Sequence, residues 1–404
     1  MKTVAILGTF DTKGKELKFV KDLIEEQGVA TLCIHTGVFE PFITPDVTNA
    51  EIAEAVGVDI NSLIEKKDRA TATLVMSKGT AMLVPELYAQ GRFDGVISIG
   101  GSGGTSVATP AMQALPIGVP KVMVSTMTSG DISPYVGTSD IVMMPSVVDA
   151  EGLNEISMKI FSNAVNAIVG MVKNTKEFKE EGKPLIAATM FGVTTPCIKT
   201  AKAYLEKHGY EVLVFHATGA GGKSMEALIE AGYIKGVLDL TTTEWCDEIV
   251  GGVLNAGPHR LEAAAKVGIP QVVSVGALDM VNFGPIDSVP AQFKERNLYQ
   301  HNPTVTLMRT TAEELQKIGK VIAEKLNLAQ GNTSLMLPLK GVSAIDVEGE
   351  AFYDPHANEM LFNTLRNHVA DTVEIIELEN AINDDAFAIA AANKLMELLK
   401  RNSA

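Results

Sequence analysis

The sequence predicts an α/β protein with two Rossmann-like open parallel sheets, each flanked by helices. Three observations favour this class. Short apolar segments alternate with helical patterns along the chain. The alternation stops once, in the charged segment 173–183, and then starts again. Each half also opens with an apolar strand and a turn of small residues, Gly8-Thr9 in one and 192–195 in the other. We therefore expect two domains, residues 1–178 and 179–404.

The first half contains five apolar segments of strand length and four segments with helical spacing of apolar residues. Leu17, Val20 and Ile24, for example, recur at helical intervals among lysines and glutamates. The expected strands are 3–7, 29–35, 94–99, 121–125 and 141–144. The expected helices are 13–27, 68–90, 105–115 and 153–173.

The second half repeats this pattern with six strands and five helices. The expected strands are 184–189, 211–215, 236–240, 270–275, 333–337 and 373–377. The expected helices are 196–208, 223–232, 260–267, 311–327 and 385–400. Thr311 and Glu314 have the spacing of a capping box, and Asp385 is a predicted N-cap.

The composition excludes several classes of protein. With 46% hydrophobic and 21% charged residues among 404, the chain has enough apolar side chains for a sizeable core. The net charge of −15 argues against nucleic-acid partners and anionic membranes, which both require a basic face. Three widely spaced cysteines indicate no disulfide framework. No signal peptide is recognised, and no apolar run reaches the ~18 residues of a membrane span, so we expect a cytoplasmic protein.

Two glycine-containing turns follow predicted strands in the first half. The stretch 100–105 places four glycines in five residues before a helix expected to start between Thr105 and Pro110. Glycines let backbone N–H groups converge on an anion, and a helix N-terminus attracts negative charge. The turn 8–13 places Asp11, Thr12 and Lys13 near the start of another helix, where open α/β sheets bind ligands.

These turns belong to a larger set of motifs. In the first half the motifs are Gly8-Thr-Phe-Asp-Thr-Lys13, Gly100-Gly-Ser-Gly-Gly-Thr105 and Ser125-Thr-Met-Thr-Ser-Gly130, and further ones lie at 190–197, 215–219, 239–244, 274–284 and 352–355. With them the chain resembles the Tm-one-like ATP-binding family over nearly its full length. The resemblance implies two Rossmann-like domains, ATP with Mg²⁺ bound in the first, and a homodimer.

The resemblance also implies a set of nucleotide contacts in the first domain. They are Asp11, Thr12, Lys13, Thr36, Arg69, Ala70, Thr71, Ala72, Gly101, Ser102, Gly103 and Gly104. Their chemistry suits phosphate and Mg²⁺, because Lys13 and Arg69 neutralise phosphate oxygens and Asp11 offers a carboxylate to magnesium or a ribose. The alternatives are a helix cap and a solvated lysine at 11–13 and a surface charge at Arg69.

The second half has weaker candidates for catalysis. The stretch 216–224 follows a strand and nearly matches a P-loop, but Ala217 stands where that motif requires glycine. A second anion pocket is the alternative, built from Gly219, Gly221, Gly222 and Lys223. His216, Asp239, Glu244 and Asp279 are expected just beyond strand ends, where they would converge on a substrate or metal.

Two further side chains of the second half, Cys197 and His301, are less distinctive. Cys197 lies at a predicted helix start, where the helix dipole would lower the pKa of its thiol. His301 lies in a polar segment expected to be a loop.

Three functions remain open from the sequence. The leading hypothesis is a Mg-ATP-binding protein that transfers a phosphoryl or nucleotidyl group to a small molecule in an interdomain cleft, with His216, Lys223 and Glu244 as candidate catalytic residues. The second is a non-enzymatic dimer that ATP stabilises and that engages a protein partner. The third is an enzyme acting on a phosphorylated or carboxylated metabolite without a nucleotide.

Overall fold

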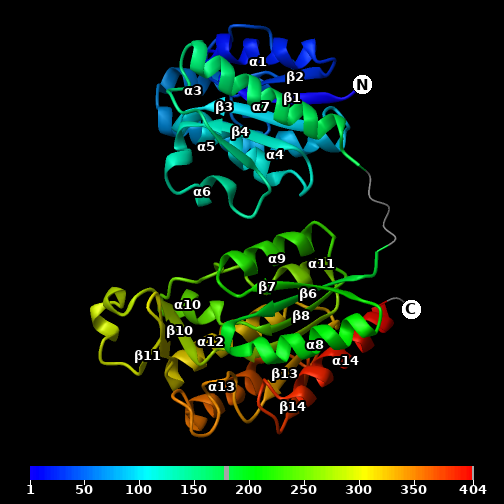
Figure 1. The fold of residues 1–404 in the computed structure, drawn as a ribbon, viewed down its shortest axis with the longest axis vertical. Coiled ribbons are helices and arrows are strands. Elements are labelled where there is room, and N and C mark those ends of the chain that lie inside the picture. The colour runs from blue at the N-terminus through cyan, green and yellow to red at the C-terminus, as the bar shows by residue number, and fades with distance from the viewer. Residues whose placement is uncertain (177–181, 403–404) are drawn as a thin grey trace. The chain divides into compact units, whose positions relative to one another are not determined.

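The chain forms two compact units, Met1–Phe178 and Lys179–Ala404, called unit 1 and unit 2 below. The structure is a computed structural model that describes residues 1–176 and 182–402. The boundary expected between residues 178 and 179 lies outside the described residues. The predicted fold class is confirmed, since each unit has a parallel sheet with helices on both faces (Figure 1).

Unit 1 is built on five parallel strands in the order β2-β1-β3-β4-β5. The strands are β1 (Thr3–Gly8), β2 (Ala30–His35), β3 (Gly95–Gly100), β4 (Lys121–Ser125) and β5 (Val142–Pro145). The helices are α1 (Gly14–Glu26), α2 (Asn49–Glu54), α3 (Ile60–Lys66), α4 (Arg69–Ala89), α5 (Ser102–Ala114), α6 (Ser133–Val136) and α7 (Glu155–Lys173), with a 3₁₀ turn at Thr126–Ser129.

Two apolar layers hold unit 1 together. On one face of the sheet, Leu17 and Val20 of α1 pack with Phe161 of α7. On the other face, Met76 of α4 packs with Val107 of α5. In Figure 1 the α1–α7 layer and the α4–α5 layer lie on opposite sides of the sheet.

Unit 2 repeats this plan with six parallel strands in the order β14-β13-β9-β8-β6-β7. These strands are β6 (Leu185–Met190), β7 (Glu211–His216), β8 (Gly236–Thr241), β9 (Gln271–Gly276), β13 (Thr333–Pro338) and β14 (Glu374–Leu378). The helices are α8 (Thr195–Lys207), α9 (Ala220–Glu230), α10 (Glu244–Val250), α11 (Ala263–Val267), α12 (Ala312–Leu326), α13 (Pro355–His368) and α14 (Asp385–Asn402). Short 3₁₀ turns lie at Gly192–Thr194, Ile286–Ser288 and Ala291–Phe293.

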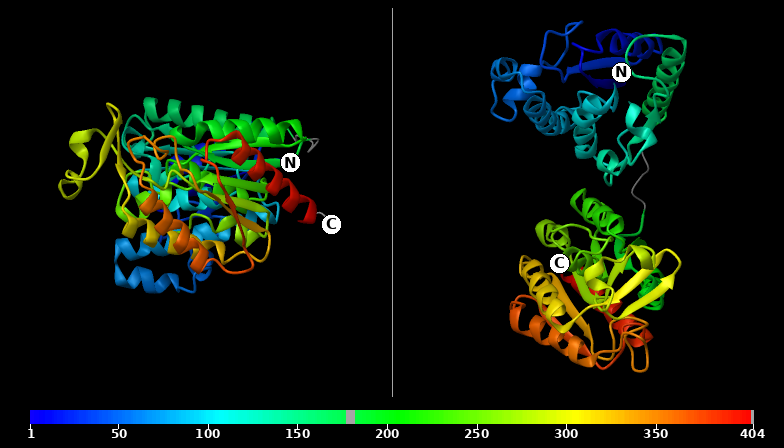
Figure 2. Two further views of the ribbon diagram at one scale, coloured as in Figure 1. Left: turned by 90° about the horizontal axis from the view of Figure 1, so that it is seen from below. Right: turned by 90° about the vertical axis from the view of Figure 1, so that its left-hand side faces the viewer.

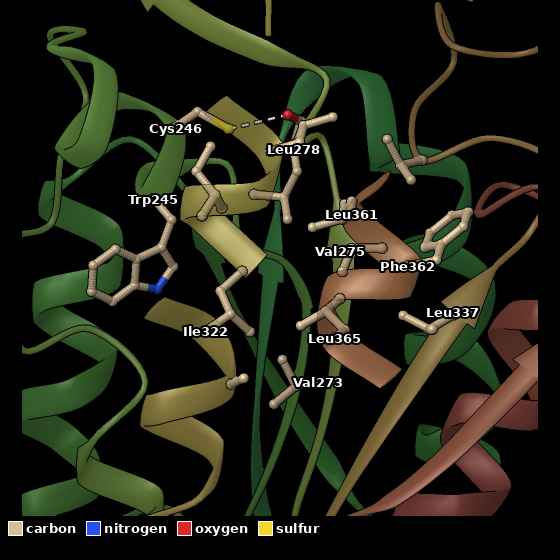
Figure 3. Packing of buried hydrophobic residues seen from close by; sticks show 14 of the residues in the cluster. Trp245, Cys246, Val273, Val275, Leu278, Ile322, Leu337, Leu361, Phe362 and Leu365 are labelled. Atoms are coloured by element: carbon tan, nitrogen blue, oxygen red, sulfur yellow. Dashed lines mark hydrogen bonds between the residues drawn. The ribbon is translucent and has the colours of Figure 1, made fainter. Parts of the chain in front are cut away.

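The main core of unit 2 packs α12 and α13 against the sheet. Figure 3 shows Ile322 of α12 and Leu361 of α13 facing Val273 and Val275 of β9. The sole tryptophan of the sequence, Trp245, lies in this core and is 2% exposed. The opposite face of the sheet is covered by α8 and α14.

A third sheet was not predicted. It is antiparallel, with the order β10-β12-β11, and consists of β10 (Met280–Phe283), β11 (Leu298–Asn302) and β12 (Val305–Arg309). Its edge strand β11 is exposed and projects from the body of unit 2 (Figure 2). His301 lies in β11, so its assignment to a loop was wrong. The sequence of this strand is polar, and a search for apolar periodicity does not detect it.

Of the two predicted helix caps, one is present in the structure and the other is not. Thr311 and Glu314 form the predicted capping box of α12. Asp385 is the first residue of α14 rather than its N-cap, and its carboxylate accepts a hydrogen bond from the Thr200 hydroxyl at 2.8 Å. Within the described residues, no helix is both long enough and apolar enough to cross a membrane.

Candidate functional site

The strand order of unit 1 reverses direction between β1 and β3. The chain leaves β1 toward β2 on one side and leaves β3 toward β4 on the other, so the loops after β1 and β3 separate at their carboxyl ends. Leu7 pairs with Ser98, which places the two strand ends side by side. Such a switch point is where open α/β sheets bind ligands. Both glycine-containing turns found in the sequence lie here.

The glycine stretch after β3 is itself the first turn of α5. Gly101 is the N-cap and provides no side chain, and the first amide of the helical ladder is Thr105 N–H, which donates to Gly101 O at 2.9 Å. The N–H groups of Ser102, Gly103 and Gly104 therefore have no acceptor within the helix. The expected helix start between Thr105 and Pro110 was wrong, because the glycines are helical instead of forming a separate loop.

A cationic side chain faces this helix end. A Cβ added to Gly103 would lie 3.5 Å from a terminal guanidinium nitrogen of Arg69, which begins α4. The backbone N–H groups that follow Arg69 already have acceptors within the protein. The Asp68 carboxylate accepts hydrogen bonds from the N–H groups of Ala70 and Thr71 at 3.0 and 3.3 Å. Ala72 N–H donates to the carbonyl of Asp68. Of the predicted residues 69–72, Arg69 thus approaches the α5 terminus with its side chain.

The turn after β1 is held by its own hydrogen bonds. Both carboxylate oxygens of Asp11 accept backbone N–H groups, from Thr12 at 2.8 Å and from Phe39 at 3.1 Å. The Thr12 hydroxyl donates to Thr9 Oγ1 at 2.8 Å, and the Lys13 ammonium donates to Ala150 O at 3.0 Å. These contacts hold the side chains of the predicted residues Asp11, Thr12 and Lys13 in place.

Thr36 follows β2 directly and is buried, with its N–H bonded to Gly8 O at 2.9 Å. Among the described residues, no group of three or more His, Cys, Asp or Glu is arranged to hold a metal ion. Magnesium in nucleotide sites is often held by phosphates and water with one or two carboxylates. The side chains present fit that mode better than an all-protein cage.

Beside the α5 terminus lies a pocket of about 480 Å³ at the ends of β4 and β5. A Cβ on Gly101 would lie 3.7 Å from Thr126 Oγ1, which lines this pocket. The lining residues are Ser125, Thr126, Thr128, Ser129, Pro145, Ser146, Val147, Val148 and Asp149. None of them is among the site residues predicted from the sequence, although the motif 125–130 contributes four of the five hydroxyl-bearing side chains.

One pocket residue has a strained backbone. Val147 has φ +62°, and Val148 N–H donates to Ser146 O at 2.7 Å across it, which defines a γ-turn. A β-branched residue with positive φ is rare, and such strain clusters at functional sites. The Val147 side chain is 77% exposed, so packing does not explain the conformation.

The polar residues of unit 2 form a closed ion cluster. Arg260 is 2% exposed and makes a two-pronged contact with Asp239, at 2.5 and 2.7 Å. Its Nε donates to Glu244 Oε2 at 2.7 Å, and Nη1 contacts Glu226 at 3.2 Å. Burial and the facing carboxylates act in opposite directions on Arg260, and the carboxylates win, so the pKa of the guanidinium is raised. Arg260, Asp239, Glu244 and Glu226 are called the Arg260 cluster below.

The near-P-loop of unit 2 binds a carboxylate of the protein itself. Glu244 Oε1 accepts the N–H groups of Gly219 and Gly222, at 2.7 and 3.1 Å. A Cβ on Gly222 would lie 2.3 Å from Glu244 Oε2, and a Cβ on Gly221 would lie 1.8 Å from His216 O. The predicted anion pocket is therefore filled from within, and its glycines are explained by close packing.

The other candidates of unit 2 do not converge as predicted. His216 ends the edge strand β7 and is exposed, and Lys223 is exposed on α9. Asp239 lies inside β8 and meets Glu244 only through Arg260. Cys197 is fully buried, and burial raises the pKa of its thiol to about 12, which is opposite to the expected lowering.

Asp279 belongs to a second buried cluster. Its Oδ2 accepts the Ser343 hydroxyl at 2.8 Å, whereas Oδ1 is buried and has no partner among the described residues. Burial and the neighbouring Asp346 raise the pKa of Asp279 to about 7. Arg309 contacts Asp346 at 3.2 Å and Phe352 O at 2.7 Å, which joins this cluster to the segment before α13.

Two further pockets lie in unit 2, lined by residues such as Ala264 and Thr333 in one and Pro184 and Tyr210 in the other. Thr333 begins its strand, and Pro184 and Tyr210 directly precede theirs, so both pockets lie at the amino edge of the sheet. Ligands of open α/β sheets bind at the opposite, carboxyl edge. Of these three pockets, the one at a carboxyl edge is that of unit 1, beside the N-terminus of α5.

Comparison with known proteins assigns both halves to one family. Residues 2–177 match the model of the N-terminal domain of the uncharacterised protein family UPF0261, and residues 183–399 match that of its C-terminal domain. A UPF0261 protein of Clostridium tetani is 60% identical over 99% of this chain and all of its own length. One from Rhizobium meliloti is 46% identical over 97% of this chain and 98% of its own length.

The family extends to plants. The ToMV resistance protein Tm-1 of Solanum lycopersicum is 41% identical over 98% of this chain, which spans 55% of the plant protein. Among solved structures, UDP-GlcNAc 2-epimerase of Methanocaldococcus jannaschii covers 68% of this chain and 83% of its own, at 11% identity and a TM-score of 0.25. A likeness this weak supports no argument about function.

Proposed function

Because this chain belongs to the UPF0261 family, which includes the tomato Tm-1 proteins, we propose that unit 1 is a nucleotide-binding module for Mg-ATP. The observation that supports the proposal is the uncapped N-terminus of α5 at the switch point, facing the Arg69 guanidinium. Three N–H groups, a helix dipole and a cation at one point form an anion site.

In this proposal the phosphates lie between the first turn of α5 and Arg69. The N–H groups of Ser102, Gly103 and Gly104 donate to phosphate oxygens, and Arg69 neutralises their charge. Lys13 and Asp11 hold the turn after β1 in place. Magnesium is bound mainly through the phosphates and water, because both oxygens of Asp11 already accept hydrogen bonds.

The proposed reaction is phosphoryl or nucleotidyl transfer to a small molecule. The pocket at the ends of β4 and β5 adjoins the α5 terminus and has the size of a small-molecule site. We propose it as the acceptor site in place of the residues His216, Lys223 and Glu244. Positioning and charge stabilisation provide most of the catalysis in such transfers.

A second candidate function is a dimer that binds a partner and does not turn over ATP. The exposed edge strand β11 favours it, because an unpaired strand edge offers backbone hydrogen bonds to another chain. Under this alternative ATP binds and raises the melting temperature, but neither ADP nor pyrophosphate is released with any acceptor.

The direct test is calorimetric titration of Mg-ATP into the wild type, Arg69→Ala and Lys78→Ala. Lys78 is an exposed cation on the same helix and serves as the matched control. Loss of a charge-assisted contact predicts roughly 10- to 100-fold weaker binding for Arg69→Ala. Equal affinity in all three proteins would contradict the proposed phosphate site. Turnover assays with ATP and candidate acceptors then separate the two functions.

A further inference from the structure

The loop after β2 presents an exposed aromatic ring on a fixed backbone. The Phe39 side chain is 57% exposed. Its N–H donates to Asp11 Oδ2 at 3.1 Å, and its carbonyl is 2.8 Å from His35 Nε2. Both main-chain groups of one exposed residue are thus held by side chains, although the ring contributes little to the core.

The residue that holds the Phe39 carbonyl is itself buried and oriented. His35 is 1% exposed, and its Nδ1 accepts the N–H of Phe10 at 3.2 Å and lies 3.4 Å from that of Gly37. With Nδ1 accepting, the proton of the neutral ring is on Nε2, which donates to Phe39 O. Gly37 also fits this arrangement, because a Cβ there would lie 2.2 Å from Asp11 Oδ1.

A second aromatic residue of the loop differs from Phe39. Phe42 is 55% exposed, but it packs against the start of α1, where a Cβ on Gly14 would lie 2.1 Å from its own Cβ. Packing against α1 therefore accounts for the position of Phe42. For Phe39, fixation by Asp11 and His35 without burial of the ring indicates that the ring serves a ligand.

The loop that carries Phe39 follows a strand close to the proposed phosphate site. β2 pairs with β1 and β1 pairs with β3, so the loops after β2 and β3 are two strand spacings apart, about 10 Å. This is comparable with the distance from the base to the phosphates of a nucleotide. We infer that Phe39 is a stacking platform for the aromatic base of a nucleotide whose phosphates lie at α5. The inference rests on the proposed function.

The platform makes unit 1 selective for nucleotides over polyphosphates of the same charge. Calorimetric titrations of the full chain with Mg-ATP and with magnesium tripolyphosphate test it, using the wild type, Phe39→Ala, Phe39→Trp and the control Met82→Ala. Met82 is 53% exposed on α4, so its truncation removes a similar apolar surface elsewhere. Melting of each unliganded variant checks that it is folded.

Phe39→Ala is expected to bind ATP roughly 5- to 100-fold more weakly, the loss typical of one stacked base. Tripolyphosphate affinity stays unchanged in this variant, and Phe39→Trp retains ATP affinity. The new tryptophan fluorescence is quenched by ATP and not by tripolyphosphate. Met82→Ala binds both ligands like the wild type.

Two results would overturn the inference alone: unchanged ATP affinity in Phe39→Ala, or an equal loss for ATP and tripolyphosphate. The second result would assign Phe39 to the shape of the phosphate site. If the wild type binds neither ligand, the proposed function fails and the inference fails with it.

Discussion

Glu244 is a buried carboxylate whose hydrogen-bonding capacity is used by the fold. It accepts two N–H groups at the start of α9 and the Nε of Arg260. Each of these donors is also buried, so the residue satisfies polar groups that water does not reach. These hydrogen bonds favour a structural role for Glu244 over the catalytic role expected from the sequence.

Glu244→Gln tests that role. The amide nitrogen would face N–H donors and leave Arg260 with less compensation, so we expect unit 2 to lose about 3 kcal/mol or more of unfolding free energy. Urea unfolding followed by Trp245 fluorescence measures it, and Glu248→Gln on the same helix is the control. Unchanged stability with abolished turnover would instead make Glu244 catalytic.

Asp279 predicts a pH dependence of stability. Its pKa is about 7 in the folded protein against 3.8 ordinarily, because burial and Asp346 disfavour its charge. The folded chain therefore binds this proton more tightly than the unfolded chain, so stability falls as pH rises between about 4 and 7. Arg309 and Ser343 act in the opposite direction and reduce the effect.

Urea unfolding between pH 4.5 and 8 measures this dependence in the wild type and in Asp279→Asn. The unfolding free energy of the variant should fall less steeply with pH than that of the wild type, and the difference should reach a few kcal/mol at most. Asp247, whose pKa is also raised to about 7, contributes to the pH dependence that both proteins retain. The control Asp287→Asn is exposed and should leave the profile unchanged. Parallel profiles for wild type and Asp279→Asn would refute the assignment.

At the scale of elements, α5 and α9 share a glycine-containing first turn and differ in what their N-termini face. The α9 terminus faces Glu244, whereas the α5 terminus has no side-chain cap and faces Arg69. A negative group already neutralises one helix end, and a positive group adds to the field of the other. Of these two helix ends, that of α5 fits the proposed phosphate site better.

Two alanine substitutions distinguish these helix ends. At Gly103 a methyl group has ordinary contact distances, so Gly103→Ala should change stability by less than about 1 kcal/mol and weaken ATP binding roughly 5- to 100-fold by occupying the cradle. At Gly222 it would lie 2.3 Å from Glu244 Oε2, so Gly222→Ala should destabilise unit 2 by about 3 kcal/mol or more with ATP affinity unchanged. Thermal melting and titration of both variants check this, and the reverse pattern would contradict it.

The elements that the sequence predicted are those with a strong apolar period. The parallel strands and the long helices α1, α4, α7 and α12 were predicted within a few residues. The elements missed were short or polar, such as α2, α6 and β11, or lay in segments without clear periodicity, such as α13. Periodicity detects burial on one face, so it does not detect an exposed edge strand.

The candidate site was predicted in part for a related reason. The glycines at 101–104 and Arg69 are visible as motifs, but the roles of Asp11 and His35 depend on which groups meet across loops. Arg260 is the clearest omission, because nothing in the sequence around it indicates that three carboxylates surround it. Tertiary contacts alone determine whether a glycine turn is filled from within or left open.

At the scale of the whole molecule, the two units share one strand order, and we propose that they differ in function. The order β2-β1-β3-β4-β5 of unit 1 corresponds to β7-β6-β8-β9-β13 of unit 2, with β14 added at the edge. In unit 2 the Arg260 cluster lies at the carboxyl end of β8, the strand that corresponds to β3. We therefore expect ligand binding in unit 1 and a mainly structural role for the polar groups of unit 2.

Thermal melting separates the units because Trp245 reports on unit 2 alone. Saturating Mg-ATP at 100 times its Kd should stabilise unit 1 by roughly 2.7 kcal/mol. Calorimetry should show a shifted transition for unit 1, and the Trp245 transition should stay in place. A shift of only the Trp245 transition would assign the nucleotide to unit 2.

Hydrogen exchange of the full chain with and without Mg-ATP tests the central claim most directly, since it locates the ligand on the backbone amides themselves. We predict slower exchange at residues 102–104 and in the turns at 9–14 and 36–42, with no change at 219–224. At an ATP concentration near the wild-type Kd, Arg69→Ala should lose most of this protection. Protection confined to 219–224, or none at saturating ATP, would contradict the assignment of the nucleotide site to unit 1.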